Sequence, residues 1–118
     1  MATTIDVGRR AESRACRYLR LRGWRIVARN WTAPGGELDI VASRWKTLLV
    51  VEVRQRGDGA PLASIDHDKW RRVRRTALTL IKSFRLQQYR LRYDVIGIDG
   101  AGRLVHRRDI FAGGQPGD

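Results

Sequence analysis

The stretch that decides the fold is residues 36–54, GELDIVASRWKTLLVVEVR. It holds two runs rich in Ile, Val and Leu, 37–42 and 46–54, separated by a turn at 43–45. Runs of this kind predict two strands of a β-hairpin. The second run contains TLLVVEVR, which is nearly all apolar, as is typical of a strand covered on both faces. We therefore expect this strand inside a sheet that carries helices.

The rest of the chain supplies those helices and three more strands. Apolar residues spaced by three and four predict helices at 5–22 and 64–84, with Ser64 as the cap of the second. The order is helix, three strands, helix, two strands, which indicates an α/β domain with a mixed sheet. We expect one domain over 1–110 and a disordered tail over 111–118. The remaining predicted elements are strands at 24–28, 91–98 and 103–107 and loops at 30–36 and 55–62.

The charge of the chain indicates a polyanionic partner. Its 118 residues include 24 Lys and Arg against 12 Asp and Glu, a net charge of +12. Such an excess concentrates nucleic acid around a protein, and the alternatives are an acidic protein partner, a membrane surface or mere composition. The single Cys16 excludes an internal disulfide, and the start of the chain has no apolar signal segment. We expect a cytoplasmic protein that does not enter membranes.

Glu52 is the residue of the decisive stretch that needs a partner. Its neighbours are apolar, and an isolated buried carboxylate is unstable. Strand alternation puts Glu52 on one face with Arg54, and it puts Glu37 and Asp39 on one face of the preceding strand. If paired residue numbers sum to 89, Glu37 lies opposite Glu52, and if they sum to 91, Asp39 does. Either register gathers three carboxylates and Arg54 on one face.

Carboxylates that face one another across strands call for a cation. One candidate is Arg54, which could form an ion pair with Glu52. The other is a divalent ion, because Mg²⁺ takes oxygen ligands and typically uses one or two carboxylates together with a phosphate. Held by Asp39 and Glu52, Mg²⁺ (or Mn²⁺) could position a water molecule and neutralise charge on a phosphodiester.

These residues carry a family resemblance. Residues 36–40, GELDI, followed by 51–54, VEVR, resemble the PD-(D/E)xK nuclease signature. From Gly8 to Ile98 the chain more closely resembles the YraN family of small bacterial proteins, which is related to archaeal Holliday-junction resolvases. The matching residues are, in order, Ala11-Glu12, Tyr18-Leu19, Gly23-Trp24, Asn30, Lys69, Ala77 and Arg92-Tyr93-Asp94-Val95-Ile96.

The resemblance implies a restriction-endonuclease-like fold and a nuclease-like protein acting on branched or structured DNA. It implies that Asp39 and Glu52 are the metal ligands, with the carbonyl of Val53 as a third. Glu12 would be an accessory acid that reaches the site from the first helix, or else a solvated carboxylate on the helix surface. The same two alternatives apply to Glu37. Resolvase relatives work as dimers, so the resemblance also allows a homodimer.

Arg54 departs from the nuclease pattern, which usually has Lys at this position. The guanidinium keeps the charge but, with a pKa above ~12, does not give up a proton. It could still stabilise negative charge in a transition state. Two other functions therefore stand beside the nuclease: a non-catalytic nucleic-acid-binding module with the same fold, and a basic protein-interaction domain.

A basic segment at residues 69–75, KWRRVRR, predicts contacts with phosphates, although such a run can also be a solvated helix face. Trp31, expected in a loop, is the candidate for stacking on bases, whereas Trp24 and Trp70 are expected in the core. The predicted phosphate contacts are Lys69, Arg71, Arg72 and Arg75.

Three other polar residues are given structural roles. Asp94 is expected to pair with an Arg. His67 and His106 are isolated, and no Cys or His spacing indicates zinc, so both are expected to be surface or cap residues.

Overall fold

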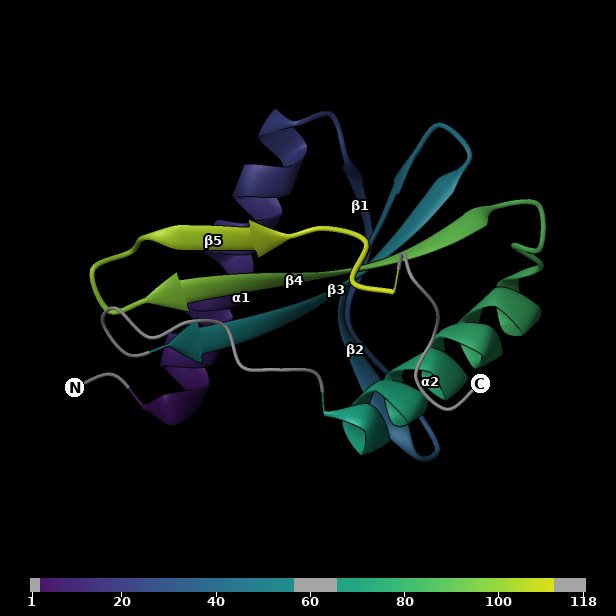
Figure 1. The fold of residues 1–118 in the computed structure, drawn as a ribbon, viewed down its shortest axis with the longest axis horizontal. Helices are drawn as coiled ribbons and strands as arrows, with labels where there is room; N and C mark the ends of the chain where they lie inside the picture. Colours follow the sequence, from purple (N-terminus) through teal and green to yellow (C-terminus); the bar gives the residue numbers. More distant parts are fainter. Residues whose placement is uncertain (1–2, 57–65, 112–118) are drawn as a thin grey trace.

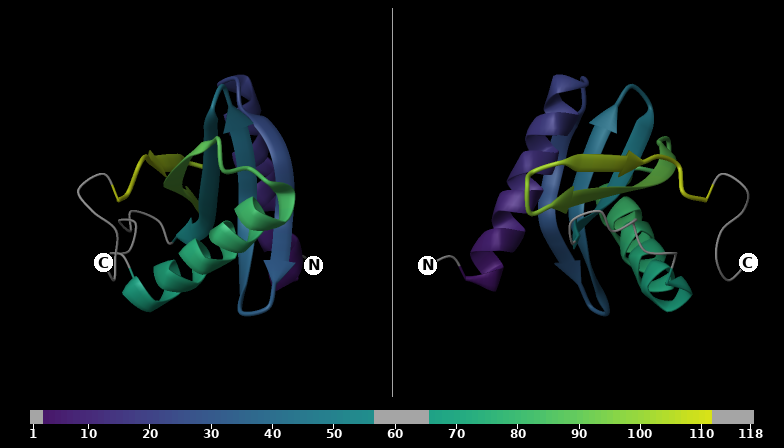
Figure 2. Two further views of the ribbon diagram at one scale, coloured as in Figure 1. Left: turned by 90° about the vertical axis from the view of Figure 1, so that its right-hand side faces the viewer. Right: turned by 60° about the vertical axis from the view of Figure 1, so that its left-hand side comes forward.

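A mixed five-stranded sheet with one helix on each face makes up the computed structural model, which describes residues 3–56 and 66–111 (Figures 1 and 2). The structure confirms the α/β class, the mixed sheet and the order α-β-β-β-α-β-β that the sequence predicts. This arrangement is consistent with the expected restriction-endonuclease-like fold. The elements are α1 (Thr4–Leu21), β1 (Arg25–Ala33), β2 (Gly36–Arg44), β3 (Thr47–Arg56), α2 (His67–Phe84), β4 (Arg90–Asp99) and β5 (Leu104–Arg107).

Strand β3 lies at the centre of the sheet, antiparallel to β2 and parallel to β4. Leu49 and Val51 pack into the core under α1, while Leu48 and Val50 pack into the core under α2. This division explains the apolar run in the sequence, because alternate side chains of β3 meet different helices. Figure 2 shows the two helices on opposite sides of the sheet.

The first hairpin is longer than the sequence predicts. The expected loop at 30–36 is wrong, because β1 continues to Ala33 and β2 begins at Gly36, so the turn is confined to two residues. Asn30 has a left-handed φ of 50° within β1. Pro34 and Gly35 mark only the turn itself, and cross-strand pairing extends the strands on either side of it.

Helix α2 begins at His67 and is capped by Asp66, whose carboxylate accepts hydrogen bonds from the main-chain N–H groups of Asp68 and Lys69. The expected cap, Ser64, lies outside the described residues, as do 57–62 of the expected loop. Neither of the described helices is long and apolar enough to cross a membrane.

The end of the described chain packs against the α2 side of the sheet. Phe111, which the sequence assigns to the tail, contacts the rings of Trp70 and Tyr93 edge-to-face, with centroids 5.3 Å from each. Phe111 therefore belongs to the packed structure, and residues 112–118 of the expected tail lie outside the described residues.

Candidate active site

Three carboxylates from β2 and β3 converge on one cavity. The β2–β3 register sums to 91, with pairs from Arg44 opposite Thr47 to Ile40 opposite Val51, and Asp39 and Glu52 are the next residues on the two strands. Of the two registers open from the sequence, the structure therefore has the one that opposes these two acids. Glu37, Asp39 and Glu52 line a cavity of about 240 Å³.

The pKa of Asp39 reflects this crowding. Burial of the side chain is the largest cause, and the nearby charge of Glu52 adds to it, so that the pKa rises from 3.8 to about 7. A hydrogen bond of 2.9 Å from the Val53 N–H to Asp39 Oδ2 opposes the rise. Glu12 and Glu37 contribute smaller repulsions. Asp39 is therefore a carboxylate whose surroundings favour either a proton or a cation.

A cation does reach these carboxylates, and it is Lys69. Its ammonium forms an ion pair with Glu52 Oε1, and Lys69 lines the cavity together with Arg72. Glu52 has an exposed fraction of 8%, so Lys69 compensates a buried charge. Lys69 is predicted from the sequence to contact a phosphate, and in the structure it contacts Glu52. The signal for an inward position was present, because Lys69 precedes the buried Val73 by four residues on the same helix face.

A glycine allows α2 to come this close. A Cβ on Gly36 would lie 2.0 Å from Thr76 Oγ1 and 3.3 Å from Thr76 Cβ. Only a residue without a side chain fits between β2 and α2 at this point. Gly36 thus brings the start of β2, and with it the cavity, against the helix that carries Lys69.

Glu12 reaches the neighbourhood of Asp39 from α1. Its carboxylate is half-buried, accepts a hydrogen bond of 2.9 Å from Asn30 Nδ2, and lies 3.9 Å from the guanidinium of Arg29. Glu12 is not among the described residues that line the cavity, so both roles predicted from the sequence stay open. Asn30, which has a left-handed φ of 50°, is the β1 residue whose side chain holds Glu12.

Two further residues named from the family pattern, Arg54 and Val53, both lie on β3. Arg54 is half-buried on β3 but is not among the described residues that line the cavity. Val53 contacts Asp39 through its N–H, whereas the resemblance implied its carbonyl as a ligand. The two cationic residues that line the cavity, Lys69 and Arg72, both come from α2.

The donor set suits a hard divalent ion that brings ligands of its own. Within residues 3–56 and 66–111, no three Asp, Glu, His or Cys side chains form a ready metal cage. Asp39 and Glu52 nevertheless supply carboxylate oxygens to one cavity, where burial first and the charge of Glu52 second raise the pKa of Asp39. Mg²⁺ commonly binds through one or two carboxylates, with water and phosphate completing its shell.

The predicted nucleic-acid contacts divide into three environments. Arg72 and Arg75 are exposed on α2, and Arg72 lines the cavity. Arg71 is exposed and forms an ion pair with Asp68 Oδ1 at 3.2 Å, so part of its charge is already compensated and it is a weaker candidate for a phosphate contact. Trp31 lies on β1 instead of in a loop, half-buried against Phe84 with ring centroids 6.3 Å apart. Trp24 and Trp70 are core residues, as predicted.

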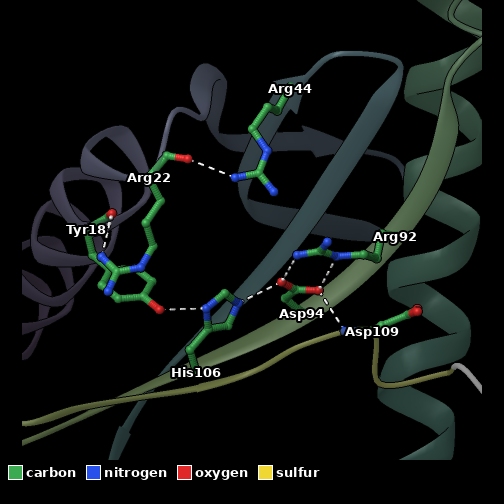
Figure 3. Close-up of polar contacts among 7 residues, drawn as sticks. All are labelled: Tyr18, Arg22, Arg44, Arg92, Asp94, His106 and Asp109. Carbon is green, nitrogen blue, oxygen red and sulfur yellow. Dashed lines mark hydrogen bonds and ion pairs between the residues drawn. The ribbon is translucent and has the colours of Figure 1, made fainter.

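A second polar cluster lies on the α1 face of the sheet, around Asp94 (Figure 3). Asp94 is fully buried and accepts two hydrogen bonds from Arg92, which confirms the expected pairing with an Arg. His106 Nε2 lies 2.6 Å from Asp94 Oδ2, and its Nδ1 lies 2.8 Å from Tyr18 Oη. The expectation of a surface His106 is wrong, since its side chain is only 6% exposed.

These contacts lower the pKa of Asp94. Burial alone would raise the pKa, but the hydrogen bonds from His106, Arg92 and the main-chain N–H of Asp109 outweigh it. The cluster joins α1, β4, β5 and the segment after β5, and it is fully satisfied. We therefore assign it a structural role.

Comparison with known proteins identifies the family. A family model described as "Uncharacterised protein family UPF0102" matches residues 11–98. A UPF0102 protein of Myxococcus xanthus is 40% identical over 100 residues, covering 82% of this chain and 79% of the relative. One of Desulfosudis oleivorans is 41% identical over 101 residues, covering 83% and 82%. One of Rhodococcus jostii is 36% identical over 118 residues, covering 94% and 100%. The chain therefore belongs to the UPF0102 family, which is the YraN family expected from the sequence.

Proposed function

We propose that this protein binds structured DNA and hydrolyses its phosphodiester backbone with the help of Mg²⁺ or Mn²⁺. The observation that carries the proposal is the shared cavity of Asp39, Glu52 and Lys69 beside the basic face of α2. Two carboxylates and an ammonium at one point are the groups that metal-assisted phosphodiester hydrolysis uses.

Asp39 and Glu52 would hold the metal ion. The bond from the Val53 N–H fixes one oxygen of Asp39, which leaves the other oxygen to act as a ligand. Glu52 is fixed by its position in the central strand. A bound divalent ion would polarise a phosphoryl oxygen and lower the pKa of a coordinated water.

Lys69 takes the part that the family pattern gives to a lysine on the strand. Its ammonium neutralises Glu52 in the metal-free protein. When a phosphate and a metal ion enter the cavity, the ammonium can turn from Glu52 to a phosphate oxygen or to the attacking water. A lysine answers the objection raised by Arg54, because a lysine side chain can lose its proton in a protein whereas an arginine stays protonated.

The surrounding charges support the approach of a nucleic-acid backbone. Arg72 at the mouth of the cavity and Arg75 one turn later are exposed. Contacts of this kind orient a duplex without reading its sequence. Glu12, held by Asn30, keeps the potential at Asp39 negative and so favours a cation there.

The test combines metal binding with cleavage of labelled DNA. Calorimetric titration with Mn²⁺ should give heat of binding for the wild-type protein, and none for Asp39→Asn or Glu52→Gln. Labelled four-way junctions, flaps and duplexes should be cut only when metal is present. The variant Asp68→Asn is the matched control, because Asp68 is an exposed acid of α2 outside the cavity.

Lys69→Met separates catalysis from folding and metal binding. It removes the ammonium that competes for Glu52, so Mn²⁺ should bind at least as tightly while cleavage is lost. Absence of any metal-binding heat and of any product from the wild-type protein would refute the nuclease. DNA binding that persists without metal binding would instead support the non-catalytic module with the same fold.

A further inference from the structure

The tip of the β2–β3 hairpin carries an aromatic side chain that the site does not use. Trp45 has an exposed fraction of 92%, whereas Trp24 and Trp70 are buried and Trp31 is half-buried. Its φ of 54° lies in the left-handed region, at the first residue of a two-residue turn. Hairpins favour Gly, Asn or Asp there. Trp45, the one highly exposed tryptophan of the four, therefore occupies a turn position whose backbone conformation is unfavourable for a bulky side chain.

The surroundings of Trp45 are strongly basic. A hollow of about 850 Å³ lies beside it and is lined by seven residues, none of which is acidic. Lys46 follows in the turn and Arg90 pairs with Thr47 at the start of β4, which adds two more positive charges. The lining residues are Arg22, Gly23, Arg25, Ser43, Arg44, Trp45 and Tyr89.

Two arginines of the hollow, Arg22 and Arg44, are held in place by contacts other than carboxylates. Arg44 donates a hydrogen bond of 2.8 Å to the carbonyl oxygen of Arg22 (Figure 3). The guanidinium of Arg44 also lies 4.1 Å from the centroid of the Trp24 ring. The guanidinium of Arg22 stacks 3.8 Å above the ring of Tyr18. Among the described residues, neither arginine forms an ion pair with an acid. Their charges are therefore ordered and available to an anion.

We propose that this hairpin tip binds an unpaired stretch of a DNA strand, with a base stacked on Trp45 and phosphates in the basic hollow. An exposed aromatic ring beside positive charges is the combination that binds single-stranded nucleic acid. The inference rests on the nucleic-acid part of the proposed function and deepens it, because it names unpaired bases as part of the substrate. A lone indole gives a lipid surface too little apolar area, which disfavours a membrane.

The tip lies well away from the candidate active site. Thr47 and Glu52 are five positions apart on β3, about 17 Å along an extended strand. A strand seated at Trp45 would therefore leave the cavity free for a phosphodiester several nucleotides away. This separation predicts that changes at Trp45 alter the choice of substrate and leave metal binding unchanged.

The test measures binding of the full chain to a labelled oligo(dT) and to a duplex of equal length by fluorescence anisotropy. Trp45→Ala should weaken binding of oligo(dT) about fivefold or more, and Trp45→Phe should retain most of it. Duplex binding and Mn²⁺ binding should change less than twofold. Oligo(dT) should also quench the intrinsic fluorescence of the wild-type protein much more than that of Trp45→Phe.

Trp45→Gly guards against a folding defect, since glycine accepts the positive φ of the turn. Unchanged oligo(dT) affinity in the Ala and Gly variants, with loss in Arg72→Ala/Arg75→Ala, would overturn this inference and leave the proposed function standing. Quenching by phosphatidylserine vesicles but not by oligo(dT) would also overturn it, in favour of a membrane contact. Binding no tighter than that of an unrelated protein of equal charge would refute both proposals.

Discussion

The substitution Asp39→Asn should make the metal-free protein more stable at alkaline pH. The folded pKa of Asp39, about 7, lies above its ordinary value of 3.8. The folded state therefore binds more protons than the unfolded state between about pH 4 and pH 7. Hence the contribution of Asp39 to the free energy of unfolding falls as the pH rises through that window. Asn carries no charge, and its oxygen can still accept the Val53 N–H.

The size of the effect follows from the pKa. About three pH units separate the folded and unfolded values, and each is worth about 1.4 kcal/mol, so the upper limit is about 4 kcal/mol. Asp39 is only partly buried, and solvent screening reduces the penalty. We therefore expect the free energy of unfolding of Asp39→Asn, relative to that of the wild-type protein, to be about 2 kcal/mol higher at pH 8 than at pH 5.

Urea unfolding in EDTA, followed by tryptophan fluorescence at both pH values, measures this difference. Comparing the two proteins at each pH isolates Asp39 from the other titrating groups. Asp94→Asn is the control, because the pKa of Asp94 is lowered and its contribution to stability changes only below about pH 4, so the difference between this variant and the wild-type protein should stay constant between pH 5 and pH 8. Parallel pH profiles for the wild-type protein and Asp39→Asn would refute the reasoning.

Two further predictions concern packing beside the site. Gly36→Ala should cost about 1–3 kcal/mol of stability, because its Cβ would collide with Thr76 Oγ1, whereas Gly100→Ala should be nearly neutral, since no atom lies within 4 Å of a Cβ there. Thermal unfolding of both variants checks this, and equal melting temperatures would contradict the close approach. Tyr93→Phe should leave stability unchanged or raise it by about 1 kcal/mol, because the buried Tyr93 hydroxyl has no hydrogen-bond partner among the described residues. A large loss in urea unfolding would show that this hydroxyl is satisfied in solution.

The sequence determined the sheet and the acidic half of the site because both depend on local periodicity. The apolar run in β3 predicted a strand covered on both faces, and alternation placed Glu37, Asp39 and Glu52 on one side. Both open registers shared that outcome. Only cross-strand pairing chose the one that opposes Asp39 and Glu52, because the hairpin turn closes with two residues.

The tertiary structure alone decided which cation meets those acids. Arg54 and Lys69 are both basic, and the family pattern favoured the strand position, yet the helix supplies the ammonium. That choice depends on how closely α2 approaches β2, and therefore on Gly36 and Thr76, which lie far apart in the sequence. The burial of His106 depended in the same way on α1 crossing β4 and β5. Periodicity fixes the face on which a side chain lies, whereas the group it meets is set by packing between distant segments.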